Sequence, residues 1–401
     1  MFNSLKFKVI LFGFIFTFFS SFGQSYFLGL FNSSIREALS ITHGQFGSIF
    51  ASATLCSSLL LIWVGKKIDD VNIFKFAFFV TILLSFACFF FSRITSVFLL
   101  FIGIFLMRFS GQGMMSHTAS TTISRYFTRT RGRALSISWF GLSSAEFVMP
   151  VLMVYLLTII DWQNLWIIFS ITVLIVLPIV SFLLIKNLNL DSREANDENK
   201  KEVEIKQWKR REVIKDYRFY IISSNMLAMP WIFTGFAVFQ SFVQTSKGWG
   251  PYVIAQSFMS YSIFSVLTLF LSGFLIDKYS SRKLLIYMNI PLLLSVIVLF
   301  SFDTPVTAFV FLGLVGISNG FANILGSSTW AELYGVKYLG SIKALTTSLM
   351  VFATAFGTAL FGYLIDIGFT VGDIAVVSGT YIFISLILLF FVRKKLNPVI
   401  I

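Results

Sequence analysis

The sequence predicts an all-α integral membrane protein, with about twelve transmembrane helices in two pseudo-symmetric six-helix bundles. Of its 401 residues, 57% are apolar, 50 are phenylalanine and only 12% are charged, whereas soluble domains carry about 25% charged residues. The mean hydropathy of +0.85 does not fit a water-exposed surface. A helix needs about 20 apolar residues to cross a bilayer, and we expect spans near residues 9–30, 44–64, 74–91, 96–123, 134–158, 164–185, 219–244, 252–273, 283–301, 306–330, 343–366 and 372–392.

Lysine and arginine residues are distributed unevenly among the loops. If both termini lie on one side, that side contains nearly all of them, and the other side has only Arg36, Arg93 and Lys247. Cytoplasmic loops are enriched in positive charge, so we expect a multi-pass protein of the cell (inner) membrane with both termini in the cytoplasm. Topology then accounts for the net charge of +13 without a nucleic-acid partner. The run 9–30 is too long for the core of a signal peptide and is interpreted as the first span.

The longest polar stretch, residues 186–218, divides the spans into six and six. We therefore expect an N-terminal six-helix bundle over 1–185, a cytoplasmic linker loop over 186–218 and a C-terminal six-helix bundle over 219–401. The linker has charges of both signs. A solvated loop is one interpretation, and the other is a surface helix anchored at the membrane interface by Val203, Ile205 and Trp208.

The two halves are related by an internal repeat at an offset of 208 residues. The offset aligns the polar loop after the second span with the loop after the eighth, and it also aligns the ends of spans 4 and 10. Six spans repeated on each side of a charged loop are typical of transporters built from parallel repeats. The matching pairs are Gly65 and Gly273, Asp69 and Asp277, Tyr126 and Tyr334, and Gly132 and Gly340.

Both loops resemble the G-x-x-x-D-[RK]-x-G-x-[RK]-[RK] loop of the major facilitator superfamily. The second copy fits more closely, with Ser280 where glycine is usual, while the first has Asp70 and Asn72 in place of a basic residue and a glycine. Residues 108–113 are similar to the family's helix 4 motif. Residues 330–335 and 339–342 resemble bacterial members near the monocarboxylate and oxalate/formate transporters.

The resemblance implies that the loop latches a cytoplasmic gate during alternating access. Physically, the glycines would let helix ends approach a neighbour closely, and the aspartates would lie at the positive N-terminus of an adjacent helix or pair with an arginine. The alternative is a topology signal at the helix end. The residues of this gating motif are Gly65, Asp69, Gly273, Asp277, Lys278 and Arg282.

Arg108 and Glu146 are the two clear charges at bilayer depth, where a charge costs at least about 2.5–3.5 kcal/mol. Their predicted depths in spans 4 and 5 differ by only roughly 5 Å at 1.5 Å per residue. Two interpretations are open. Arg108 attracts an anionic substrate and Glu146 carries a coupling proton, or the two form a permanent ion pair that fixes helix packing.

Polar residues on spans 1, 4, 7 and 10 are further candidates, because the resemblance places these spans around a central cavity. Span 4 has Arg108, Gln112, Ser116 and Ser120 at a spacing of four, which is one helical face, and span 10 has a similar stripe. His117 fits a packing role or a proton role, and Pro230 is expected to kink span 7. Interhelical hydrogen bonding is the alternative for each polar residue. The remaining candidates are Gln24, Tyr26, Trp139, Asn225, Trp231, Asn319, Asn323 and Ser327.

The function predicted from these features is secondary active transport of a small organic anion such as a monocarboxylate, coupled to protons. The sequence has no phosphate-binding loop for ATP, no metal-ligand spacing and no nucleophile paired with a base. We therefore expect no enzyme activity, no cofactor and no metal, with the lipid bilayer, a small solute and a proton as partners. The alternatives are an exporter of amphipathic compounds and a transporter-like membrane sensor that signals through the linker.

Overall fold

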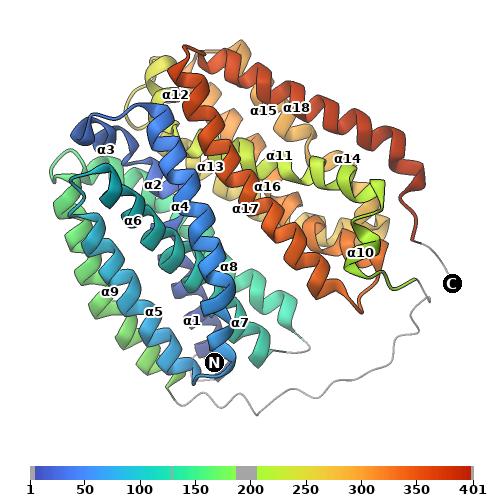
Figure 1. Ribbon diagram of the computed structural model, residues 1–401, viewed down its shortest axis with the longest axis horizontal. Coiled ribbons are helices and arrows are strands. Elements are labelled where there is room, and N and C mark those ends of the chain that lie inside the picture. Colours follow the sequence, from blue (N-terminus) through green and yellow to red (C-terminus); the bar gives the residue numbers. More distant parts are fainter. Residues whose placement is uncertain (1–4, 128–129, 187–205, 399–401) are drawn as a thin grey trace. The chain divides into compact units, whose positions relative to one another are not determined.

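The computed structural model describes residues 5–127, 130–186 and 206–398, which form helices joined by short loops (Figure 1). Within these residues, twelve helices are long and apolar enough to cross a membrane. The chain divides into two compact units, Met1–Asn199 and Lys200–Ile401, and each contains six of the twelve spans. The predicted all-α membrane fold is confirmed.

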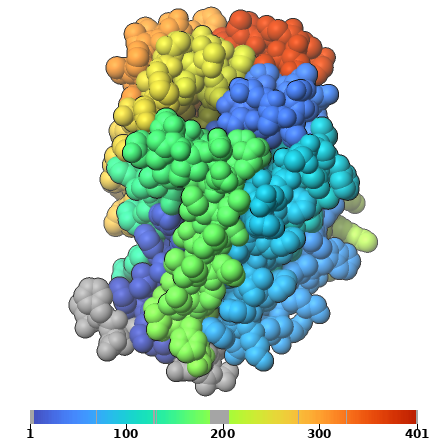
Figure 2. Space-filling model, turned by 90° about the vertical axis from the view of Figure 1, so that its left-hand side faces the viewer, coloured from blue at the N-terminus to red at the C-terminus, as the bar shows by residue number. Residues whose placement is uncertain are grey.

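The first unit contains nine α-helices and a π-helical stretch within its described residues. Helix starts follow the sequence, since the Thr42 hydroxyl accepts the backbone N–H of Gln45 in a capping box. Figure 2 shows α9, in green, along the outer surface of this unit. The elements are α1 (Leu5–Ser20), α2 (Ser25–Gly29), α3 (Asn32–Leu39), α4 (His43–Val64), α5 (Ile73–Phe91), α6 (Val97–Met107), the π-helix Arg108–Met115, α7 (Ser116–Tyr126), α8 (Arg131–Leu156) and α9 (Trp162–Ile185).

The second unit repeats the same order of spans. In the first unit the main helix pairs are α1 with α8, α4 with α6, and α5 with α9. The corresponding spans pair in the second unit as α11 with α17, α13 with α16, and α15 with α18, which is the expected pseudo-symmetry. Its helices are α10 (Arg210–Val213), α11 (Tyr217–Val238), α12 (Gln240–Ser246), α13 (Val253–Tyr279), α14 (Ser281–Met288), α15 (Ile290–Ser301), α16 (Pro305–Tyr334), α17 (Leu339–Asp366) and α18 (Val371–Val392).

Three spans predicted as single helices are interrupted. The span 9–30 breaks between α1 and α2, the span 219–244 breaks at Phe239, and the span 283–301 breaks at Asn289. The last break has a local cause, because Pro291 is the second residue of α15 and has no backbone N–H to continue the ladder. The buried Asn289 side chain then donates to the carbonyl of Asn225 at 2.5 Å.

The described end of the linker belongs to the packing of the second unit. Val203 and Ile205 lie outside the described residues. The Trp208 ring packs edge-on against Tyr334 with centroids 5.4 Å apart, so this residue is part of the packing of the second unit. The backbone N–H of Trp208 also donates to the Tyr334 carbonyl at 3.0 Å.

Ser280 joins α13 to α14 with φ 69° and ψ 149°, a region that is essentially restricted to glycine and costs about 1–3 kcal/mol for other residues. Glycine is the usual residue at this place in the loop motif. The Ser280 hydroxyl is also buried without a hydrogen-bond partner within the described residues.

We predict that Ser280→Gly raises the free energy of unfolding by about 1 kcal/mol, because relief of the strain exceeds the entropy that glycine adds to the unfolded chain. Thermal unfolding in detergent measures the change. Ser92→Gly is the control, since Ser92 has an ordinary φ of −66° and the substitution should not stabilise. A melting temperature unchanged or lowered by Ser280→Gly would contradict the prediction.

Candidate functional site

The break in the first span packs directly against the π-helical stretch of the fourth. A 3-10 turn, Ser21–Gly23, is followed by Gln24 in an extended conformation with ψ 150°. Gly23 and Gly111 touch through their backbones, since a Cβ on Gly111 would lie 2.6 Å from the nitrogen of Gly23. Small residues allow such close approach of helices in membranes, and π-helical turns often occur at functional sites.

Arg108 binds the backbone that this break exposes. Its side chain is 2% exposed, and Nη1 donates to the carbonyl of Gly23 and to the hydroxyl of Ser25, both at 3.1 Å. The guanidinium carbon lies 5.3 Å from the centre of the Phe50 ring. No carboxylate pairs with Arg108 among the side chains that the structure describes, so the structure contains no Arg108–Glu146 ion pair.

Glu146 approaches the same break from α8. Its side chain is 7% exposed and lies within electrostatic reach of the Tyr26 phenol. Close packing of α1 on α8 sets this position, because the Thr17 hydroxyl donates to the carbonyl of Ser138 at 2.5 Å. A guanidinium and a carboxyl group therefore approach residues 23–26 from two sides without forming an ion pair.

Other predicted residues of the first unit lie at the break, in the π-helix, on α7 and on α8. Gln24 and Gln112 are half-buried at the break and in the π-helix. Trp139 is half-buried on α8, two turns before Glu146. The Ser120 hydroxyl donates to the Ser116 carbonyl within the helix at 2.7 Å, which satisfies it locally.

The first gating loop is held by α7. His117 Nε2 lies 3.0 Å from the carbonyl oxygen of Gly65, and Arg125 Nη1 donates to the carbonyl of Ile68 at 3.0 Å. This contact fits the packing role considered for His117. The side chain of Asp69 lies outside the described residues.

The second gating loop is organised by a residue that sequence reasoning missed. Glu332 accepts the backbone N–H groups of Ser281 at 2.8 Å and Arg282 at 3.4 Å, so it caps the N-terminus of α14 in the way expected of an aspartate. A Cβ on Gly273 would meet nothing within 4 Å, so the close approach expected at this glycine is not seen within the second unit and stays a prediction. Lys278 is exposed and lies over its neighbour Tyr279. The side chain of Asp277 lies outside the described residues.

Asn225 and Trp231 pack between helices of the second unit. The amide of Asn225 donates to the Ser385 hydroxyl at 3.5 Å, and Trp231 stands edge-on to Tyr381 with centroids 5.2 Å apart. Neither residue lines the cavity described next, so their contacts fit the packing alternative.

A cavity of about 200 Å³ lies in the second unit, beside Pro230 of α11. Asn319 and Asn323 line it as expected, and the Asn319 amide also donates to the Ser265 hydroxyl at 2.9 Å. Ser327, the third member of the predicted stripe, has its side chain outside the described residues. No charged side chain is among the lining residues, which are Ser223, Met226, Leu227, Met229, Pro230, Phe233, Met288, Asn319, Ala322, Asn323, Gly326, Trp330, Thr346, Leu349 and Met350.

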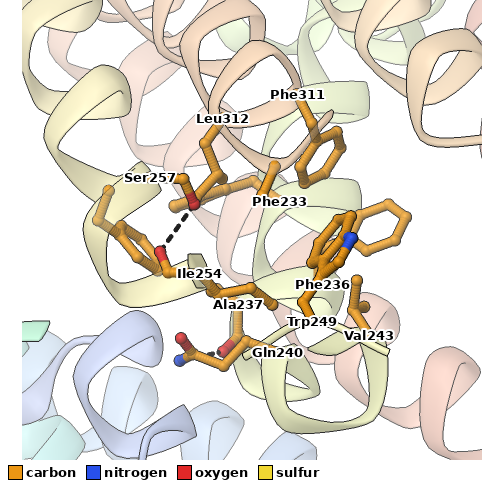
Figure 3. A pocket seen from close by; sticks show the side chains of 12 residues that line it. Phe233, Phe236, Ala237, Gln240, Val243, Trp249, Ile254, Ser257, Phe311 and Leu312 are labelled. Atoms are coloured by element: carbon orange, nitrogen blue, oxygen red, sulfur yellow. Dashed lines mark hydrogen bonds between the residues drawn. The ribbon is translucent and has the colours of Figure 1, made fainter. Parts of the chain in front are cut away.

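A smaller apolar pocket of about 20 Å³ lies further along the same helices (Figure 3). Phe233, Phe236 and Phe311 surround it, with Gln240 at one end. The Gln240 amide donates to the Ala237 carbonyl at 2.9 Å. The space fits about one water molecule, so it is a packing void and not a solute site.

Comparison with known proteins decides the family. The family model described as Major Facilitator Superfamily matches residues 13–259 and 220–400. The chain belongs to the major facilitator superfamily. No sequence of a curated protein matches it.

Solved structures of superfamily transporters show the same fold at low identity. A crystal structure of a bacterial homologue of the human lysosomal transporter Spinster, inward-facing and unoccupied, is similar with a TM-score of 0.74 at 12% identity over 98% of both chains. The nucleoside transporter NupG gives 0.70 at 15% identity, over 98% of this chain and 99% of that one. These likenesses agree with the fold, and membership of the superfamily makes the chain a membrane transporter.

We predict that Gly111→Ala destabilises the protein by about 1–3 kcal/mol, because the added methyl group would overlap the Gly23 backbone. Gly132→Ala is the matched control, since a Cβ there meets nothing within 4 Å. Thermal unfolding of both variants in detergent measures the effect. Equal melting temperatures would show that the backbone contact at Gly23 is not tight.

Proposed function

We propose that this superfamily transporter carries a small organic anion, such as a monocarboxylate, together with a proton. The observation that carries the proposal is Arg108, a buried guanidinium that has no carboxylate partner among the described side chains. The likeness in sequence to monocarboxylate and oxalate/formate transporters supports the same solute class. We place the protein in the cell inner membrane with both termini in the cytoplasm, on the distribution of basic loops.

Arg108 retains capacity to bind an anion. Its bonds to Gly23 and Ser25 both use Nη1, while Nε is buried without a hydrogen-bond partner within the described residues. A buried, unpaired charge is costly in a membrane, and a carboxylate matches the fork of guanidinium donors in geometry and charge. Binding an anionic solute would therefore satisfy both the charge and the free donor.

Glu146 fits the role of proton carrier. Its carboxyl group is shielded from solvent and makes neither a hydrogen bond nor an ion pair with the described residues. Burying a carboxylate is strongly unfavourable unless it is paired or protonated. Proton uptake at Glu146 would neutralise the site while Arg108 holds the anion, which gives the coupling a physical basis.

We predict that substitutions at Arg108 and Glu146 have different effects on the transport of a panel of carboxylates by proteoliposomes: the first weakens substrate binding and the second removes proton coupling. Arg108→Gln should lower uptake at low substrate concentration by about 10- to 100-fold, because a charged hydrogen bond of about 1.5–3 kcal/mol is lost. Glu146→Gln should abolish accumulation driven by a pH gradient but retain exchange of labelled for unlabelled substrate. Radiolabel uptake and exchange measure the two activities.

The matched controls for this experiment are Arg93→Gln and Glu37→Gln, which change exposed charges and should leave both activities intact. Uptake by Arg108→Gln equal to that of the wild type would contradict the role of Arg108, and gradient-driven accumulation by Glu146→Gln would contradict the role of Glu146. If the folded wild type moves no carboxylate at all, the anion proposal fails while the superfamily assignment stands.

Export of amphipathic compounds is a second candidate, favoured by the cavity in the second unit. Its walls are mainly methionine, leucine, phenylalanine and tryptophan, with the two amides of Asn319 and Asn323 and no charge. Ligand sites are largely apolar with a few polar groups that orient the ligand, and methionine adapts to varied shapes. An uncharged, mostly apolar solute would fit this chemistry better than a small anion.

We predict for this candidate that Ala322→Trp slows release of an uncharged amphipathic dye from vesicles at least tenfold, because the indole ring occupies the cavity beside Asn323. Ala344→Trp is the control, since Ala344 is exposed on α17. Fluorescence of the released dye is the readout, with melting temperatures to confirm folding. Equal release from both variants and from empty vesicles would eliminate the candidate.

A further inference from the structure

The segment after α18 is fixed to the second unit by two arginines. Arg218 donates to the carbonyl oxygens of Lys395 at 3.3 Å and Asn397 at 2.9 Å. Arg282 donates to the carbonyl of Leu396 at 3.0 Å and to the Asn397 side chain at 2.7 Å. Leu396 is buried in the apolar core of the unit. The chain here is therefore an anchored part of the unit.

Three exposed basic side chains project from this anchored segment: Arg393, Lys394 and Lys395. Within the described residues, none of them pairs with a carboxylate. The carboxylate of Asp216 is already bound by Arg218 at 2.8 Å. Glu332 lies 4.0 Å from Arg282 in the same way. Two of the five cations at Arg218, Arg282 and 393–395 are thus paired with a carboxylate, and the three at 393–395 are the excess that an external anion would balance.

The basic cluster continues directly into an apolar surface. Residues on the outer face of α18 are strongly exposed, with Phe391 at 75% and Phe383 at 55%. Figure 1 shows α18 running along the edge of the second unit toward the C-terminus. Because α18 is a membrane span, this face meets acyl chains and the cluster at its end meets the headgroup layer.

We propose that the end of α18, with the starts of α11 and α14, binds the phosphate headgroup of an anionic phospholipid whose acyl chain lies along α18. Basic clusters beside membrane spans recognise anionic headgroups, and the bonds to Leu396 and Asn397 fix Arg218, Arg282 and the backbone next to the three exposed cations before a lipid arrives. Preorganised groups bind with a smaller loss of entropy. The site is separate from Arg108 and Glu146, so it does not depend on the solute carried.

The test compares two double variants of the full-length protein in detergent. Lys394→Gln with Lys395→Gln removes the cluster's lysines, and Lys66→Gln with Lys67→Gln is the matched control at the end of α4, where both lysines are exposed. Each charge at a membrane surface contributes about fivefold in affinity. The dissociation constant for phosphatidylglycerol should therefore rise about 30-fold in the first variant and stay within about twofold of wild type in the control.

Three further arms make the outcome decisive. Replacing both lysines with arginine should retain affinity, because the charge is kept. Phosphatidylcholine should bind weakly to every variant, and equal binding of the two lipids would overturn the proposal. Inorganic phosphate at millimolar concentration should not raise the melting temperature, and a rise that matches phosphatidylglycerol would assign the cluster to a soluble anion instead. An unchanged affinity for phosphatidylglycerol in Lys394→Gln with Lys395→Gln would also overturn the proposal of a lipid site.

Discussion

The hydrogen bond from Arg108 to the carbonyl of Gly23 reduces two free-energy penalties that arise in the membrane interior. A helix break leaves backbone groups without intrahelical partners, which lipid cannot satisfy, and a buried guanidinium needs acceptors. The contact of Gly23 with Gly111 brings the Gly23 carbonyl close enough to accept a hydrogen bond from the Arg108 guanidinium. The positions of Ser25 beside Arg108 and of Tyr26 beside Glu146 follow from the same break.

The second copy of the repeat meets the same constraint without a charge. At the offset of 208 residues, Phe22 aligns with Pro230 and Arg108 aligns with Gly316. At Pro230 the helix α11 continues without a break. Gly316 packs closely against the backbone of Tyr261. The two copies have therefore diverged at one equivalent place, into a charged centre in the first unit and an uncharged cavity in the second.

The sequence was sufficient for features that depend on composition and periodicity. The spans, the repeat and the two intramembrane charges follow from residue type alone, because charge is rare at that depth. The break before Ser25, the cap formed by Glu332 and the docking of Trp208 depend on contacts between distant segments, which no local pattern reports. Asn225 illustrates the limit, since its polarity marked it as a cavity candidate while its partners are Ser385 and Asn289.

The separation of Arg108 from Glu146 has a consequence for coupling that a permanent ion pair would lack. A pair would be neutral in the empty protein, and binding an anion or a proton would have to break it. With the charges unpaired, the empty site carries one isolated cation and one isolated carboxyl group, each costly to keep in a low-dielectric interior. On the proposed mechanism, both are neutralised only when an anion and a proton are bound together. The electrostatic free energy of the occluded state is then lowest when both the anion and the proton are bound, which favours joint movement of solute and proton.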